Sequence, residues 1–249
     1  LHQGLRAAIA NREIFPITMS SAVHGIGIST TLDSIVDILP SPLDRGDFPA
    51  TNVAGEPNDV AVDLAGPVAA LIFKTINDPH SGRISLLRVV SGKLESDCTT
   101  WNVRAEENER LGHLQLMQGK TGKATGAAIC GDIVGVAKLK ISNTGDTLCT
   151  RTAPVHVTWI DLPPPAMSFA VEPKSKGDDE RIGEAVQRVM DEDIALKSGR
   201  DAQTGEYLLS GTGQLHVEIN VAKLRKRFKV DVILHPPKVP YREAIRRKA

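Results

Sequence analysis

Residues 207–219 read Tyr-Leu-Leu-Ser-Gly-Thr-Gly-Gln-Leu-His-Val-Glu-Ile, an apolar strand followed by a glycine turn and the start of a helix. Gly211 and Gly213 are expected to give the turn backbone angles that other residues avoid. The hydroxyl of Thr212 is expected to cap the first helical turn. Neither Gly nor Pro occurs from Gln214 to Phe228, so this segment predicts a long helix rather than another strand.

The segments around this stretch predict a β-α-β-β-α-β order, which is a ferredoxin-like unit. A turn at Gly205 is expected to close the central hairpin. The stiff spacer Pro163-Pro164-Pro165 marks the boundary before the unit. The expected elements are strand 167–171, helix 178–190, strands 194–198 and 207–209, helix 214–228 and strand 230–234.

Between residues 68 and 162 the pattern changes to short alternating apolar runs separated by turn residues. Regular short strands with such turns predict a closed β-barrel. The expected strands are 68–76, 83–90, 99–103, 111–115, 132–139 and 155–161.

The first 42 residues predict the end of an α/β domain. A helix over Leu1–Asn11 is followed by a strand over Ile14–Met19 and a second helix capped by Ser29 or Thr30. The apolar positions Leu32, Ile35, Val36 and Leu39 follow the spacing of a helical face. Residues 43–67 are rich in Pro, Gly and Asp and are expected to form a linker.

Composition restricts the class of protein. The 249 residues hold 30 Lys and Arg and 30 Asp and Glu, for a formal net charge of zero, and 41% are hydrophobic. The 3 cysteines lie far apart, which argues against a disulfide framework or a zinc ribbon and favours reduced thiols. No run approaches the ~18 apolar residues of a membrane span, so we expect a cytoplasmic protein without a membrane partner.

Ser-Gly-x-Gly-x-Leu-His-x-Glu-Ile, at residues 210–219, resembles the signature of the third domain of the elongation factor G family. Thr212 and Gln214 stand where that family would have Met and Glu. Further resemblances follow in the same order along nearly the whole chain, at residues 21–22, 38–42, 78–82, 88–92, 131–133, 144–149, 172–174 and 240–243. The resemblance implies the tail of a GTPase domain at 1–42, a linker at 43–67, a domain II barrel at 68–162 and a ferredoxin-like domain III at 163–249.

The resemblance also implies a parent translational GTPase that uses GTP and Mg²⁺ and binds the ribosome, both rRNA and ribosomal proteins. Ser21 and Ala22 resemble the family's fifth guanine-binding motif. The segment has no G-x-x-x-x-G-K-[ST], Asn-Lys-x-Asp or Asp-x-x-Gly motif, so we expect it to be inactive as a GTPase and to hold no cofactor itself. A ribosomal protection, recycling or release factor 3 type is an alternative, and a standalone RNA-binding barrel is an alternative of another class.

Several polar groups are candidate sites, and no catalytic residue is predicted among them. The basic residues near the end of the long helix either stabilise its dipole or face rRNA phosphates, together with Arg242, Arg246 and Arg247. His216 and Glu218 point in different directions on a helix, which favours hydrogen bonding over metal binding. Asp191-Glu192-Asp193 is expected to be a solvated turn. The basic residues predicted to contact rRNA are Lys223, Arg225, Lys226, Arg227 and Lys229.

Overall fold

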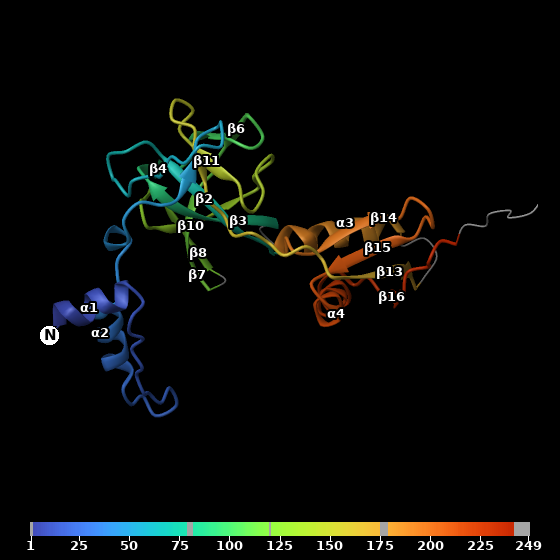
Figure 1. Cartoon of the computed structure of the whole chain (residues 1–249), viewed down its shortest axis with the longest axis horizontal. Coiled ribbons are helices and arrows are strands. Elements are labelled where there is room, and N and C mark those ends of the chain that lie inside the picture. Colours follow the sequence, from blue (N-terminus) through green and yellow to red (C-terminus); the bar gives the residue numbers. More distant parts are fainter. Residues whose placement is uncertain (1, 79–81, 120, 175–178, 242–249) are drawn as a thin grey trace, which may run out of the picture. The chain divides into compact units, whose positions relative to one another are not determined.

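A computed structural model describes residues 2–78, 82–119, 121–174 and 179–241 of the chain. The chain forms two compact units (Figure 1). The first contains Leu1–Phe73, Leu86–Ser142 and Asp146–Thr158, and the second contains Lys74–Ser85, Asn143–Gly145 and Trp159–Ala249. No helix in the described part of the chain is long and apolar enough to cross a membrane.

The first unit begins with two helices, α1 (His2–Ala10) and α2 (Ile28–Ile38), as predicted. The predicted strand over Ile14–Met19 is wrong, because this segment forms no strand. A strand needs a neighbour for its amides and carbonyls, and the Ile17 side chain is 90% exposed. The expected cap at Ser29 or Thr30 is also wrong, since the residue before α2 is Gly27, which has a φ of 73°.

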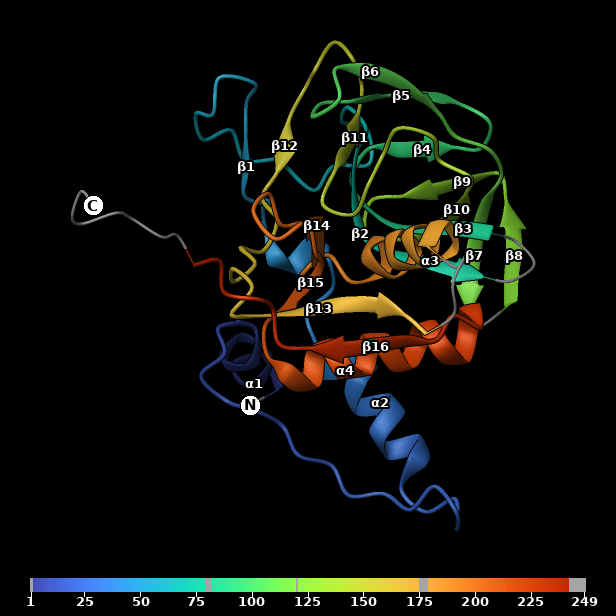
Figure 2. The ribbon, with the colours of Figure 1, turned by 90° about the vertical axis from the view of Figure 1, so that its right-hand side faces the viewer.

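An eight-stranded sheet forms the body of the first unit, in the order β6-β5-β11-β2-β3-β10-β7-β8. Figure 2 shows these strands surrounding a common interior. The barrel prediction is confirmed in part, because β6 and β8 remain the edge strands of the sheet. The strands are β2 (Ala69–Asp78), β3 (Gly82–Ser91), β5 (Thr99–Asn102), β6 (Glu107–Arg110), β7 (Leu114–Gln118), β8 (Thr121–Thr125), β10 (Ile133–Ala137) and β11 (Thr147–Cys149).

Aliphatic side chains fill the interior of this sheet, and Ile72, Leu87 and Leu148 are fully buried there. Two short strands, β4 (Lys93–Glu95) and β9 (Ala127–Ile129), pair separately. The predicted linker is folded onto this unit. It carries the 3₁₀ turn η1 (Leu43–Arg45) and β1 (Ala50–Thr51), which pairs with β12 (His156–Val157).

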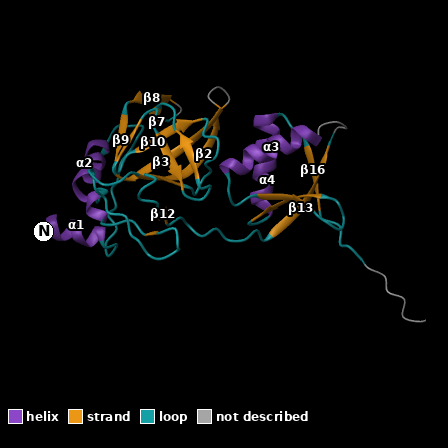
Figure 3. Ribbon diagram, turned by 90° about the horizontal axis from the view of Figure 1, so that it is seen from above, coloured by secondary structure: helices purple, strands orange, loops and turns teal. Residues whose placement is uncertain are grey.

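The second unit has the predicted ferredoxin-like order. Its sheet runs β14-β15-β13-β16, and one core joins strand residues to both helices. Figure 3 shows α3 and α4 together on one side of β13 and β16. The elements are β13 (Met167–Pro173), α3 (Asp179–Glu192), β14 (Lys197–Arg200), β15 (Tyr207–Gly211), α4 (Gln214–Lys223), the π turn η2 (Leu224–Phe228) and β16 (Val232–His235).

Candidate functional site

The five predicted rRNA contacts lie where the regular helix ends. After Lys223 the chain continues as the π turn η2 and then enters the left-handed region at Lys229, with φ 57° and ψ 36°. The Lys229 amide donates to the Leu224 carbonyl and closes this turn. π turns and left-handed non-glycine residues are uncommon and concentrate at functional sites. We call Lys223, Arg225, Lys226, Arg227 and Lys229 the basic cluster.

Arg227 is the most firmly held residue of the basic cluster. Its Nη1 lies 2.6 Å from Glu192 Oε2, and its Nη2 lies 2.9 Å from Glu192 Oε1. Nη2 also donates to the Asn77 carbonyl in the same unit, at 2.6 Å. The hydrogen bond with Glu192 raises the pKa of Arg227 above its usual value. The guanidinium of Arg227 is therefore a structural cation as well as a surface charge.

The other four residues of the basic cluster divide into two kinds. Arg225 pairs with Asp231, and Lys223 donates to Asn220 Oδ1 at 2.9 Å. Lys226 and Lys229 are exposed and form no ion pair with another described residue. The carboxylates of Glu192 and Asp231 thus neutralise part of the cluster and leave these two lysines to solvent. The additional arginines at 242, 246 and 247 lie outside the described residues.

The signature stretch forms a hydrogen-bonded group around His216. The Thr212 amide donates to His216 Nδ1 at 3.0 Å, so Nε2 carries the proton and donates to Asp193 Oδ2 at 2.9 Å. Asn220 Nδ2 donates to the same carboxylate oxygen at 3.1 Å. Burial raises the pKa of Asp193, but the hydrogen bonds from His216 and Asn220 outweigh it, and the pKa lies below its usual value.

This group corrects three expectations. Gly213, not Thr212, precedes α4, and no side chain caps the helix. Glycine is required at position 211 because the His216 ring packs closely against it, and not because of its backbone angles. A Cβ there would lie 2.6 Å from His216 Nδ1. The predicted solvated turn is wrong for Glu192 and Asp193, since both carboxylates bind side chains of the π turn or α4.

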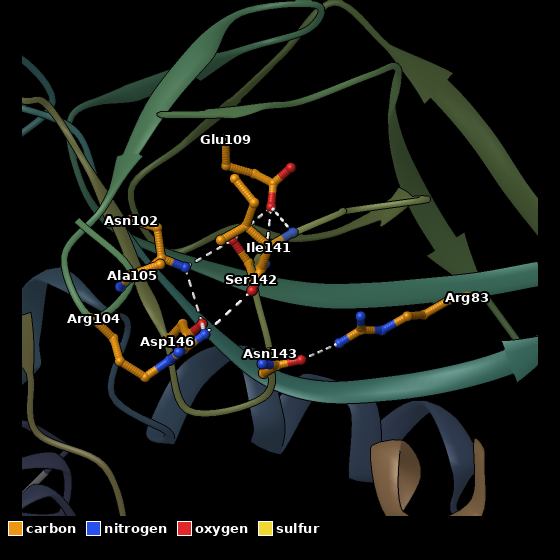
Figure 4. Close-up of polar contacts among 9 residues, drawn as sticks. All are labelled: Arg83, Asn102, Arg104, Ala105, Glu109, Ile141, Ser142, Asn143 and Asp146. Carbon is orange, nitrogen blue, oxygen red and sulfur yellow. Dashed lines mark hydrogen bonds and ion pairs between the residues drawn. The ribbon is translucent and has the colours of Figure 1, made fainter. Parts of the chain in front are cut away.

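A polar network holds the loop before β11 in the first unit (Figure 4). The buried Glu109 carboxylate accepts the amides of Lys140, Ile141 and Ser142 at 3.1, 2.8 and 2.9 Å. Asp146 binds Arg104 through two hydrogen bonds of 2.5 and 2.8 Å, which raise the pKa of that arginine. These groups satisfy each other, so the network is a scaffold for the loop rather than a reactive centre.

The predicted guanine-binding remnant lies in a small loop. Ser21 forms an antiparallel bridge with Ile26, in which the Ser21 amide donates to the Ile26 carbonyl at 2.9 Å. Ala22 lies in the turn between the two bridge partners. The bridge orders the backbone at this point, and the guanine role of Ser21 and Ala22 stays a prediction.

Sequence reasoning missed the contribution of α3 to the basic surface. Arg181 and Arg188 lie on one face of α3, beside Phe228 of the π turn. The Arg188 guanidinium carbon is 6.0 Å from the centre of the Phe228 ring, and that of Arg227 is 5.6 Å from it. Arg181 and Arg188 are seven residues apart, a spacing that predicts one helical face. No local sequence pattern predicts that this face of α3 lies against Phe228.

Comparisons with known proteins agree with this architecture. Residues 162–236 match the family described as Elongation Factor G, domain III, and residues 67–151 match Elongation factor G domain 2. A crystal structure of a protein from Thermus thermophilus superposes with a TM-score of 0.79 at 31% sequence identity. The match covers 97% of this chain and 34% of that chain, so this chain spans about a third of its relative. With both family matches in the expected order on the expected folds, the chain belongs to the elongation factor G family and contains its domains II and III.

Proposed function

We propose that this chain is the ribosome-docking and coupling part of a translational GTPase. Family membership supports a role in translation. The GTPase motifs absent from this sequence would belong to other parts of the parent protein, which would bind GTP and Mg²⁺. Ser21 and Ala22 would touch the guanine edge there. The chain alone is expected to show no sub-micromolar affinity for GTP in a calorimetric titration.

The basic cluster is the observation that carries the docking part of this proposal. It combines exposed lysines with a π turn and a left-handed residue. Among the described residues of the second unit, Lys229 is the one non-glycine residue with a positive φ. Positive side chains on a fixed backbone suit an A-form RNA surface, which proteins bind through phosphates and shape rather than base edges.

The coupling part follows from the physics of a two-state protein. The factor would have two arrangements of its domains, and the bound nucleotide would favour one of them. Docking can respond to the nucleotide only if these two arrangements bind the ribosome with different affinities. A change in population from 1:99 to 99:1 requires about 5.5 kcal/mol of differential binding. Translocation of tRNA and mRNA would be work of the whole factor, and this segment is not expected to perform it alone.

Sedimentation with small ribosomal subunits over a series of salt concentrations tests the docking proposal. The chain should co-sediment, with an affinity that falls as salt rises. Lys226→Glu should weaken binding and flatten its salt dependence. Lys197→Glu on β14, a change of the same charge on the same unit, is the matched control and should have a smaller effect. Equal salt dependence in wild type and Lys226→Glu would argue against the basic cluster as the docking surface.

A further inference from the structure

The hairpin formed by β2 and β3 is shared between the sheet of the first unit and the packing of the second. Both strands belong to the eight-stranded sheet, yet residues 74–85, which include the end of β2 and the start of β3, are part of the second compact unit. The hairpin therefore needs contacts of its own inside the second unit, and Asn77 supplies them.

Asn77, the last residue but one of β2, binds the ferredoxin-like domain through three polar groups. Its backbone amide donates to Glu192 Oε1 at 2.7 Å, and its carbonyl accepts from Arg227 Nη2 at 2.6 Å. Its side-chain Nδ2 donates to the Arg188 carbonyl at 2.7 Å. One residue of the hairpin is thus bound to both α3 and the π turn.

Glu192 joins these contacts into one group. Its carboxylate oxygens bind the Arg227 guanidinium at 2.6 and 2.9 Å, and its side chain is only 13% exposed. Glu192 is the last residue of α3, where the helix dipole disfavours negative charge, so the helix does not account for this carboxylate. The closed ring of hydrogen bonds from Asn77 to Glu192 to Arg227 and back does account for it. We call Asn77, Glu192 and Arg227 the lock.

The lock holds the part of the π turn that carries free lysines. Lys226 precedes Arg227, and Lys229 follows it by two residues; both are exposed and form no ion pair with another described residue. A guanidinium bound by both oxygens of a carboxylate has one preferred orientation. Phe228, the next residue, packs against the core of the unit. The backbone between the two lysines is therefore held both by the lock and by the core.

We propose that the lock positions Lys226 and Lys229 for RNA phosphates and so couples the β2–β3 hairpin to docking. This inference rests on the proposed ribosome docking, and it assigns Asn77 and Glu192 as positioning residues that do not touch the RNA. A turn that is already ordered loses less conformational freedom on binding than a mobile one. Because coupling between two sites is reciprocal, RNA that binds the locked turn more tightly must also hold the hairpin more firmly.

Fluorescence anisotropy of the whole chain with protein-free small-subunit rRNA tests the positioning role. Glu192→Gln removes a negative charge beside the basic cluster, so charge by itself predicts tighter binding, whereas loss of the lock predicts binding at least about fivefold weaker. Glu184→Gln removes the same charge from an exposed position on α3 and is the matched control, which should not weaken binding. Asn77→Ala changes no charge and should weaken binding in the same direction as Glu192→Gln.

Hydrogen exchange supplies a readout that a purely structural role would not change. In the free chain, Glu192→Gln should speed exchange in residues 74–78, because the Asn77 amide loses a charged acceptor. Saturating rRNA should slow exchange in this segment about fivefold in the wild type and much less in Glu192→Gln. Residues 201–205, in the turn between β14 and β15 of the same unit, are the control segment and should exchange equally with and without rRNA.

The outcomes separate the lock from the docking function. Weaker binding by Glu192→Gln, together with slowing of residues 74–78 by rRNA, supports the lock; if Glu192→Gln melts early, Asn77→Ala decides in its place. Unchanged or tighter binding, or exchange that does not respond to rRNA, overturns the lock and leaves the docking proposal standing. A loss on whole subunits without a loss on protein-free rRNA overturns it in favour of a ribosomal protein. Failure of the wild-type chain to bind subunits at all would contradict the docking function itself.

Discussion

Glu109 shows how one buried carboxylate orders a loop. The residue is 2% exposed, and its carboxylate accepts three consecutive backbone amides together with the Ser142 hydroxyl. Glu109→Gln should lower the free energy of unfolding by about 2–3 kcal/mol, because an amide nitrogen would then face backbone donors in place of a carboxylate oxygen. Urea denaturation measures the change. Glu107→Gln, exposed on the same strand, is the control, and equal small effects at both positions would show that the amides find other acceptors.

Asp193 gives the second unit a pH dependence of known sign. Its pKa is lower in the folded chain than its ordinary value of 3.8, so its stabilising contribution is present above that value and is lost as the pH falls through the folded-state pKa. Protonation weakens the carboxylate as an acceptor for His216 and Asn220, and it removes the charge near Lys223.

Asp193→Asn should therefore destabilise the chain at neutral pH by about 1 kcal/mol, and it should flatten the loss of stability in acid. Thermal unfolding between about pH 6 and about pH 3 measures both effects. Asp191→Asn, two residues earlier, should leave the acid response of the wild type in place. A variant at Asp193 that keeps the full acid response would show that other carboxylates cause it.

At the scale of elements, the end of α4 offers a test in which one substitution has opposite effects at two positions. Lys229 occupies the left-handed region at φ 57°, which costs a residue with a Cβ about 1–2 kcal/mol, whereas Lys226 lies inside the helical π turn. Lys229→Gly should stabilise the chain by about 0.5–1 kcal/mol after the entropy of glycine in the unfolded chain is included. Lys226→Gly should destabilise it by about 1 kcal/mol. Guanidinium denaturation compares the two, and the same sign at both positions would contradict the backbone account.

The elements also show which parts of the fold a sequence can predict. The ferredoxin-like order was predictable because α3, α4 and their neighbouring strands carry local periodicity and turn residues. Strand β8, Thr-Gly-Lys-Ala-Thr, was missed because it is polar and largely exposed along its length, so its pairing with β7 is set by the partner strand. The error at Ile14–Met19 is the reverse, because a strand was predicted there and none forms. The apolar pattern favours a strand, but it does not show whether a partner strand is present.

The candidate site was predictable only in its local part. The basic cluster is contiguous in sequence, so its residues could be named, but a π turn has no simple sequence signal. The partners Glu192 and Asn77 depend on how α3 and β2 fold back on the turn, whereas Asp231 lies nearby in sequence, just before β16. For the same reason, the sequence predicted a solvated turn at residues 191–193 and did not show that Glu192 binds the π turn and Asp193 binds α4.

At the scale of the whole molecule, the segment 14–39 exposes many large apolar side chains within a short length of chain. Residues 14–39 expose Phe15 and Met19 by 75% and 91%, together with the outer face of α2. A large exposed apolar surface is uncommon on a folded protein unless another surface covers it. The exposed large apolar residues of this segment are Ile14, Phe15, Ile17, Met19, Val23, Ile26, Ile28, Leu32, Ile35, Val36 and Leu39.

Removing residues 1–38 should therefore clearly reduce binding of the dye ANS by the chain, because that dye reports exposed apolar surface. The deletion should leave thermal unfolding of the remaining chain unchanged, since the three buried clusters contain only Ala50 and later residues. Leu32→Ser/Val36→Ser in the intact chain should give a smaller decrease in dye binding without altering the cores. If the shortened chain binds as much dye as the full one, the exposed apolar surface lies elsewhere. If its melting temperature falls sharply, the helices α1 and α2 stabilise the first unit more than their burial indicates.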